Sequence, residues 1–411
     1  MVFQVVLIAQ SNKINYEKYQ LPNGLKVILH QDNTVPVVAV TALYHVGSKN
    51  EDSNRTGFAH FFEHLLFEGT ENIKRGEFQK YITNAGGMYN ANTSQDRTFY
   101  YELLPSNQID LGLWLESERM MHANILQEGV NTQREVVKEE KRMRMDNRPY
   151  GSIITEILKR AYIKHPYRWY TIGSLEHLNK ASLDEFINFY KTFYVPNNCV
   201  LTIAGDFDMV KLKEQINAYF ADIPKGKNEI PRPNIKEDEM EKEVRDIVED
   251  NIQLPAVIEA YRTPKQGTKE YYAFRILTNI LAEGESSRLN KELVDKKQSA
   301  VYIGSIPFFN EDAGLLINFA IANAGNNPSD LEKQIDSITD ILKTTLISDK
   351  EFEKVKNQIQ TSITNENATM AGIAENLANF EVYFGDANLI NNELNKYNEI
   401  SKQDIQDIAK K

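Results

Sequence analysis

Residues 57–66 read Gly-Phe-Ala-His-Phe-Phe-Glu-His-Leu-Leu, and the rest of the chain is organised around them. They contain the pattern His-x-x-Glu-His, in which His60 and His64 are four positions apart. Residues four apart lie on one face of an α-helix, so both imidazoles can bind one cation. Glu63 stands beside them and can deprotonate a water molecule bound to that cation. The pattern therefore predicts a helical zinc site with a carboxylate as general base.

Two histidines at this spacing could also form an ordinary surface pair. The residues after the motif, Leu65, Leu66 and Phe67, are apolar and predict that the polar cluster is half buried. Buried histidine and glutamate side chains need partners, and a metal ion supplies them. The flanks therefore favour the metal site, on a helix that Asn54 or Thr56 could cap. The order His-x-x-Glu-His, the reverse of His-Glu-x-x-His, is the signature of the inverzincins.

A catalytic zinc ion needs a third protein ligand and an open fourth position for water. Residues 132–142, Thr-Gln-Arg-Glu-Val-Val-Lys-Glu-Glu-Lys-Arg, favour a helix. With this segment the chain resembles the pitrilysin/insulinase family of inverzincin metallopeptidases, in particular its bacterial two-domain members and the metal-bearing subunit of mitochondrial processing peptidase. The resemblance implies that Glu140 is the third ligand and that each chain binds one zinc ion.

Two residues near Glu140 need separate interpretation. Glu139 is its neighbour and points about 100° away on a helix, so we expect it to face elsewhere. The family usually has a glutamate two turns before the ligand, and here that position holds Gln133. We expect Gln133 to lie beside the metal-binding side chains, where it can form a hydrogen bond but adds no charge.

Residues 88–101 predict a hairpin-like pair of strands. An exposed strand edge offers unpaired amides and carbonyls, so an extended peptide can add to it. The family has a matching Asn-Ala-x-Thr segment on such an edge. The resemblance therefore implies that Asn90, Ala91 and Asn92 bind the substrate, although Asn90 could instead be an ordinary turn residue.

The 411 residues suggest two or more domains. Residues 229–250 are polar, contain two prolines and are the best linker candidate. The order of expected strands and helices in 251–411 echoes that in 1–228, which predicts two homologous α+β domains, each a mostly antiparallel sheet packed with helices. The echo ends at a helix beside Lys411, so we expect the second domain to lack its last strand.

The second half carries the remaining candidate site residue. In the family this half supplies an arginine and a tyrosine that bind the substrate and stabilise the oxyanion. Tyr302 matches the tyrosine, although it could be an ordinary strand aromatic, whereas the arginine position holds Val294 or Asp295. Arg288 lies two helical turns earlier and is interpreted as a structural residue. Two domains also make only half of the chamber found in the family. We therefore expect a heterodimer with a related subunit that carries the arginine–tyrosine pair, with a homodimer as the alternative.

Composition excludes several other classes of function. The net charge is -11 without a basic cluster, which argues against nucleic-acid binding. The single cysteine, Cys199, excludes disulfides within the chain and a cysteine zinc site. No stretch is long enough to span a membrane. Residues 1–10 are apolar but form only a short run. They could be the tail of a signal peptide, which favours an exported or periplasmic protein over a cytoplasmic one. A first strand or a tag remnant would give the same pattern.

These observations predict a zinc-dependent endopeptidase. Short or unfolded peptides would bind in a chamber as an added strand, and Glu63 would act as general base towards the zinc-activated water. One alternative is a non-catalytic binding or assembly subunit on the same fold. Another is a metal-sensing or storage module, which would not need a base beside the water.

Overall fold

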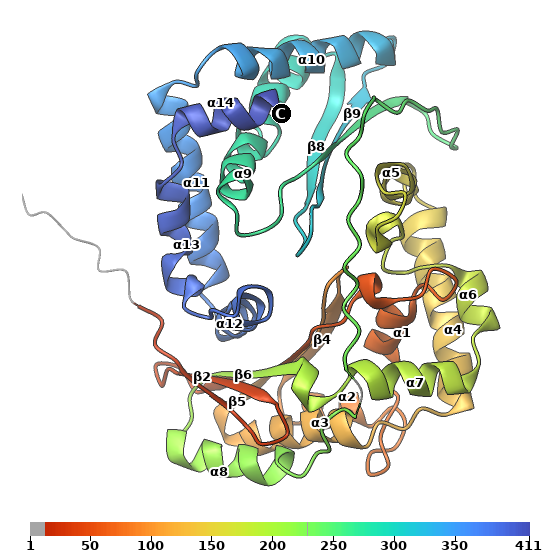
Figure 1. Ribbon diagram of the computed structural model, residues 1–411, viewed down its shortest axis with the longest axis vertical. Helices are drawn as coiled ribbons and strands as arrows, with labels where there is room; N and C mark the ends of the chain where they lie inside the picture. Colours follow the sequence, from red (N-terminus) through yellow and green to blue (C-terminus); the bar gives the residue numbers. More distant parts are fainter. Residues whose placement is uncertain (1–12, 228) are drawn as a thin grey trace, which may run out of the picture.

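The computed structural model describes residues 13–227 and 229–411 and shows a two-domain α+β fold (Figure 1). The start of the chain, on which the expectation of export rests, lies outside the described residues. Within the described residues, the strands of the first half are β1 (Glu17–Gln20), β2 (Lys26–Gln31), β3 (Val37–Tyr44), β4 (Met88–Thr93), β5 (Thr98–Pro105) and β6 (Cys199–Gly205).

These strands form one sheet in the order β1-β2-β6-β3-β5-β4. Only β2 and β6 run parallel, and the other neighbours are antiparallel. The apolar run of β3 explains its place at the centre of the sheet, because seven of its eight residues are buried. β4 alternates exposed and half-buried residues and has only β5 as a partner. The predicted hairpin is therefore present, and β4 is an edge strand.

The helices of the first half are α1 (Phe58–Leu65), α2 (Phe78–Asn84), α3 (Ile109–Met121), α4 (Gln127–Lys141), α5 (Ile153–Ala161), α6 (Leu175–Lys180), α7 (Leu183–Phe193) and α8 (Met209–Phe220). A π-helical turn over Arg142–Asp146 continues α4. Apolar side chains from this half form a continuous core between the helices and one face of the sheet.

The second half contains β7 (Ala256–Arg262), β8 (Ala300–Phe308) and β9 (Leu315–Ala322), in an antiparallel sheet of order β7-β9-β8. Its helices are α9 (Lys269–Leu281), α10 (Pro328–Thr344), α11 (Asp349–Glu366), α12 (Met370–Phe384), α13 (Leu389–Asn398) and α14 (Lys402–Lys410), with a π-helical segment at Asn290–Lys296. Along the part of the chain that the structure describes, no strand follows α14, and β7 forms a sheet edge.

Helix α12 joins the two halves. It belongs to the second half in sequence but packs on the sheet of the first half, mainly over β6 and β3 (Figure 1). Its residues Ile373 and Leu377 share a buried cluster with Leu43 and Phe99. Both faces of the first sheet are therefore covered, one by helices of its own half and the other by α12.

A buried ion pair forms a second contact between the halves. The loop between β8 and β9 carries Glu311 and Asp312, whose carboxylates lie 2.6 and 3.3 Å from Lys49 Nζ. Lys49 also lies 2.8 Å from Asp96 and is almost completely buried. Ion pairs in such an environment are stabilising only when each charge has close partners, and Lys49 has three.

None of the helices described has the combined length and apolarity needed to cross a bilayer. Residues 224–255, which include the expected linker, contain no helix or strand among the positions described and run between the two halves (Figure 1).

Candidate metal centre

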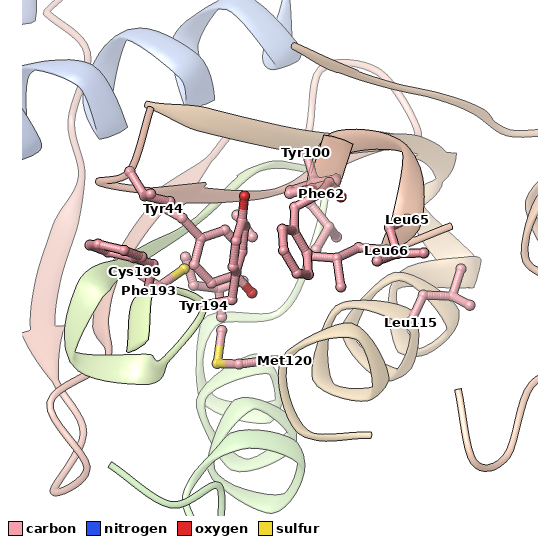
Figure 2. Packing of buried hydrophobic residues seen from close by; sticks show 14 of the residues in the cluster. Tyr44, Phe62, Leu65, Leu66, Tyr100, Leu115, Met120, Phe193, Tyr194 and Cys199 are labelled. Carbon is pink, nitrogen blue, oxygen red and sulfur yellow. Dashed lines mark hydrogen bonds between the residues drawn. The ribbon is translucent and has the colours of Figure 1, made fainter. Parts of the chain in front are cut away.

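Helix α1 carries the motif and is held by its apolar face. Phe58, Phe61, Phe62 and Leu65 are buried, as expected for a short helix whose polar residues share the opposite face. Phe62 packs among the aromatic side chains of the first core, with its ring centroid 5.1 Å from that of Tyr194 (Figure 2). This packing fixes the rotation of the helix about its axis and so the direction of its polar side chains.

A buried carboxylate stands at the start of α1. Glu51 accepts hydrogen bonds of 2.8 Å from the backbone N–H groups of Gly57 and Ala59. A negative group at a helix N-terminus satisfies free N–H groups and complements the helix dipole. Burial nevertheless raises the pKa of Glu51 to about 8. The expected caps, Asn54 and Thr56, are wrong because Gly57 takes the N-cap position with a left-handed φ of 96°.

A buried guanidinium stands at the other end of the same helix. Arg119 donates a 3.0 Å hydrogen bond to the carbonyl of Leu66, directly after α1. Its charge is met by Glu116 at 3.0 Å and Glu102 at 3.2 Å, all fully buried. Burial and repulsion from Glu116 raise the pKa of Glu102 well above its ordinary value, so the cluster approaches neutrality. Hydrogen bonds to Glu51 at the start of α1 and from Arg119 after its end therefore hold the helix in place.

The structure brings together the three residues expected to bind the metal. Glu140 Oε2 lies 3.4 Å from His60 Nε2 and 3.2 Å from His64 Nε2. One potential ligand atom from each residue lies within 4.8 Å of the others, the only such group of histidine, cysteine or acidic residues found at the described positions. Two imidazole nitrogens and one carboxylate oxygen form a zinc donor set that leaves a fourth position open.

The polar atoms of this cluster are suited to a cation. Glu140 Oε2 is buried and has no hydrogen-bond partner, although two imidazole nitrogens surround it. Burial alone would raise the pKa of Glu140. Hydrogen bonds and charge interactions with His60 and His64 outweigh burial and hold this pKa well below its ordinary value. A buried carboxylate oxygen without a donor is costly, and a zinc ion between the three residues would satisfy it. The residues therefore fit the ion.

Arg144 forms an ion pair with the other carboxylate oxygen of Glu140. Its Nη1 lies 2.7 Å from Glu140 Oε1, so Oε2 is the oxygen left to face the histidines. Arg144 belongs to the π-helical turn after α4, a distortion often found at functional sites. Glu139 is exposed and lies 3.3 Å from Arg142, away from the cluster. The structure thus separates the two adjacent glutamates in the way that helix geometry predicts.

Glu63 and Gln133 make different contacts. The hydroxyl of Thr93, at the end of β4, donates a 2.6 Å hydrogen bond to Glu63 Oε2. Gln133 lies on α4 and donates to Glu68, while its own side-chain oxygen is buried without a partner. The hydrogen bond of Gln133 therefore goes to Glu68, one turn after His64, and a role for Gln133 in supporting the metal-binding side chains stays a prediction.

The three expected substrate-binding residues lie on the edge strand. Asn90 and Asn92 are exposed, whereas Ala91 is half buried. Asn90 Oδ1 accepts from the N–H of Ala91 at 2.9 Å, and Asn92 Oδ1 accepts from Arg97 at 3.0 Å. Asn90 is thus a strand residue rather than a turn residue. Their role in binding a peptide stays a prediction.

Tyr302 lies in the other half, on edge strand β8. Its side chain is 52% exposed and stacks on Phe319 at 5.3 Å between ring centroids. Of the two candidates for the missing arginine position, Val294 packs against the second core and Asp295 is exposed. Arg288 makes a bidentate ion pair with Glu351, at 2.9 and 2.7 Å, in agreement with a structural role.

Sequence reasoning missed four residues that hold this site: Glu51, Thr93, Arg119 and Arg144. Arg144 follows Glu140 by four positions, and this helical spacing could have revealed it. Thr93 and Arg119 reach the site through contacts distant in sequence, whereas Glu51 accepts from N–H groups only six and eight residues later.

Comparison with known proteins agrees with this geometry. Residues 26–173 match the family described as "Insulinase (Peptidase family M16)", and residues 180–359 match the "Peptidase M16 inactive domain". The zinc protease PqqE of Helicobacter pylori is 34% identical over 361 residues, covering 87% of this chain and 81% of that protein. The uncharacterized zinc protease YmxG of Bacillus subtilis is 24% identical, covering 96% of this chain and 95% of that one.

A solved structure extends the similarity to three dimensions. The crystal structure of a protease from Helicobacter pylori superposes with a TM-score of 0.92 at 30% sequence identity, covering 96% of each chain. The metal cluster on α1 and α4 lies within the segment that matches the insulinase description. The chain therefore belongs to the insulinase family of peptidases, family M16.

Proposed function

We propose that this chain is a zinc-dependent endopeptidase that cleaves short or unfolded peptides bound as an added strand on β4. One observation carries the proposal: Glu63, within the metal-binding motif, contacts Thr93 at the end of an edge strand. A peptide added to that edge would run past the metal cluster. A folded protein could not supply an unpaired extended segment, so the geometry supports selection of short or unfolded chains.

The residues of the chain divide the work between binding and proton transfer. His60, His64 and Glu140 would hold a zinc ion, which would supply Lewis acidity and lower the pKa of a bound water molecule. Glu63 accepts the proton of the attacking water and delivers it to the nitrogen of the leaving amine. The exposed edge of β4 would hold the peptide backbone extended. The scissile carbonyl would then stay within reach of the metal cluster and of Glu63.

Degradation of a defined mixture tests this function. The mixture contains short peptides, an unfolded protein and a folded protein, each incubated with and without a chelator. We expect cleavage of the first two, loss of cleavage with the chelator and recovery on adding zinc. His64→Ala should be inactive, whereas His122→Ala should retain activity because His122 lies at the surface beside Glu71. Cleavage that persists in the chelator would contradict a zinc mechanism.

The non-catalytic alternative remains a second proposal because one match favours it. Residues 180–359 match a domain described as inactive, although that segment does not contain the metal cluster. In a binding or assembly subunit, zinc would be bound by the purified chain, but no peptide in the mixture would be cleaved. The same experiment therefore separates the two proposals.

We further propose that the active unit is a heterodimer with a related chain, with a homodimer as the alternative. Two observations support it: neither Val294 nor Asp295 can replace the family arginine, and Arg288 is engaged by Glu351. An oxyanion needs such a donor close to the reacting carbonyl. We expect the purified chain to cleave peptides slowly and a related chain bearing the arginine–tyrosine pair to accelerate it. A full rate from this chain, unchanged by any partner, would exclude the divided site.

A further inference from the structure

We propose that Thr93 is a positioning residue for Glu63 and couples the peptide-binding strand to the general base. The proposal rests on the proposed function and adds a residue to its site. Its basis is the 2.6 Å hydrogen bond from Thr93 Oγ1 to Glu63 Oε2, which joins the last residue of β4 to α1. Across the residues that the structure describes, no other side chain donates a hydrogen bond to Glu63.

The strand aims Thr93 at α1 for a simple geometric reason. Side chains alternate along a strand, and in β4 the exposed positions alternate with half-buried ones. Tyr89, Ala91 and Thr93 share the half-buried side, and the first two pack against the core that includes α1. Asn90 and Asn92 point the other way. One strand therefore presents its asparagines to solvent and its threonine hydroxyl to the base.

The end of β4 is held firmly, so this hydroxyl has a defined position. The turn after Thr93 is closed by Ser94, whose Oγ accepts from the backbone N–H groups of Asp96 and Arg97, each at 3.2 Å. Arg97 in turn donates to Asn92 on the strand and to Asn379 on α12 at 2.6 Å. A threonine on a rigid turn can restrict a carboxylate that would otherwise rotate about its last bond.

The hydrogen bond has a specific consequence for proton transfer. A hydroxyl donating to a carboxylate makes a charge-assisted bond, which is stronger than a neutral one. With Oε2 fixed in this way, Oε1 is the oxygen left to accept a proton.

Substitution of Thr93 tests the coupling. Thr93→Val keeps the β-branched shape that suits a strand and removes only the donor, whereas Thr93→Ser keeps the donor. We expect Thr93→Val to lower kcat about 10- to 100-fold with KM and zinc content nearly unchanged, and Thr93→Ser to restore most of the rate. Thr83→Val is the matched control, because Thr83 lies exposed on α2 and donates to the carbonyl of Gln79.

Combination with Glu63→Gln shows whether Thr93 acts through Glu63. If it does, Thr93→Val should have little further effect on the residual rate of Glu63→Gln. A rate for Thr93→Val within twofold of the wild type, or independent effects in the double variant, would overturn the proposal.

A double-mutant cycle of thermal unfolding gives a readout that does not depend on activity. We expect the effects of Thr93→Val and Glu63→Ala on stability to be non-additive, since either change alone removes the same hydrogen bond. Additive effects would show that the bond is absent and would also overturn the proposal. A wild-type protein that cleaves no peptide would reject the proposed function and the catalytic role of Thr93 with it. The unfolding cycle would still show whether the two side chains are bonded.

Discussion

Glu63→Gln is expected to keep its zinc and to lose about 10²–10⁴-fold in the rate of peptide cleavage. Glutamine has the shape of glutamate and can still accept from the Thr93 hydroxyl, so the packing around α1 should survive. It cannot accept a proton, because an amide is not basic near neutral pH. The three metal-binding side chains are unchanged, which is why metal content and activity should separate.

Metal analysis and single-turnover kinetics on the same sample measure both quantities. Glu71→Gln, at an exposed position, is the control for changing one carboxylate to an amide. A Glu63→Gln protein that cleaved peptides at the wild-type rate would show that another group acts as base. Loss of zinc from the variant would instead show that Glu63 supports the metal site.

Glu140→Gln is expected to weaken zinc binding by more than the roughly 10- to 100-fold that is typical of losing a supporting residue around a metal. The change replaces an anionic oxygen ligand by an amide and leaves two histidines to hold the ion. The same substitution at Glu139 should have little effect, because its side chain is exposed and faces Arg142.

Competition with a chelator of known affinity gives the zinc dissociation constants of both variants. The pair is well matched, since the two residues are adjacent on one helix and undergo the same chemical change. Zinc loss from Glu139→Gln with full binding by Glu140→Gln would move the ligand by one position and contradict the geometry of the cluster.

The sequence predicted the parts of this site that depend on helical periodicity. His60 and His64 lie on one face because they are four residues apart, and the same rule separated Glu139 from Glu140. The family resemblance supplied the partner segment, which periodicity alone could not choose among the many acidic helices of this chain. The edge position of β4 was also expected, and the strand order places it there.

Two supports of the site, Thr93 and Arg119, were not predictable, because each depends on a contact between distant segments. Arg119 donates to the carbonyl of Leu66, directly after α1, although it lies 53 residues later in the chain. Likewise, nothing near residue 93 indicates that its hydroxyl meets Glu63. The packing of α12 on the first sheet could not be predicted either, since an apolar helix pattern does not identify the surface that the helix will cover.

The position of α12 has a consequence for the synthesis of the protein. β6, a central strand of the first sheet, ends at Gly205, whereas the helix that covers the outer face begins at Met370. At about 5–20 residues per second, a ribosome needs roughly ten to thirty seconds to make the intervening segment. During that time the nascent first half presents Leu43 and Phe99 to water or to a chaperone. The first half is thus synthesised first, but the outer face of its sheet stays uncovered until nearly the whole chain has been translated.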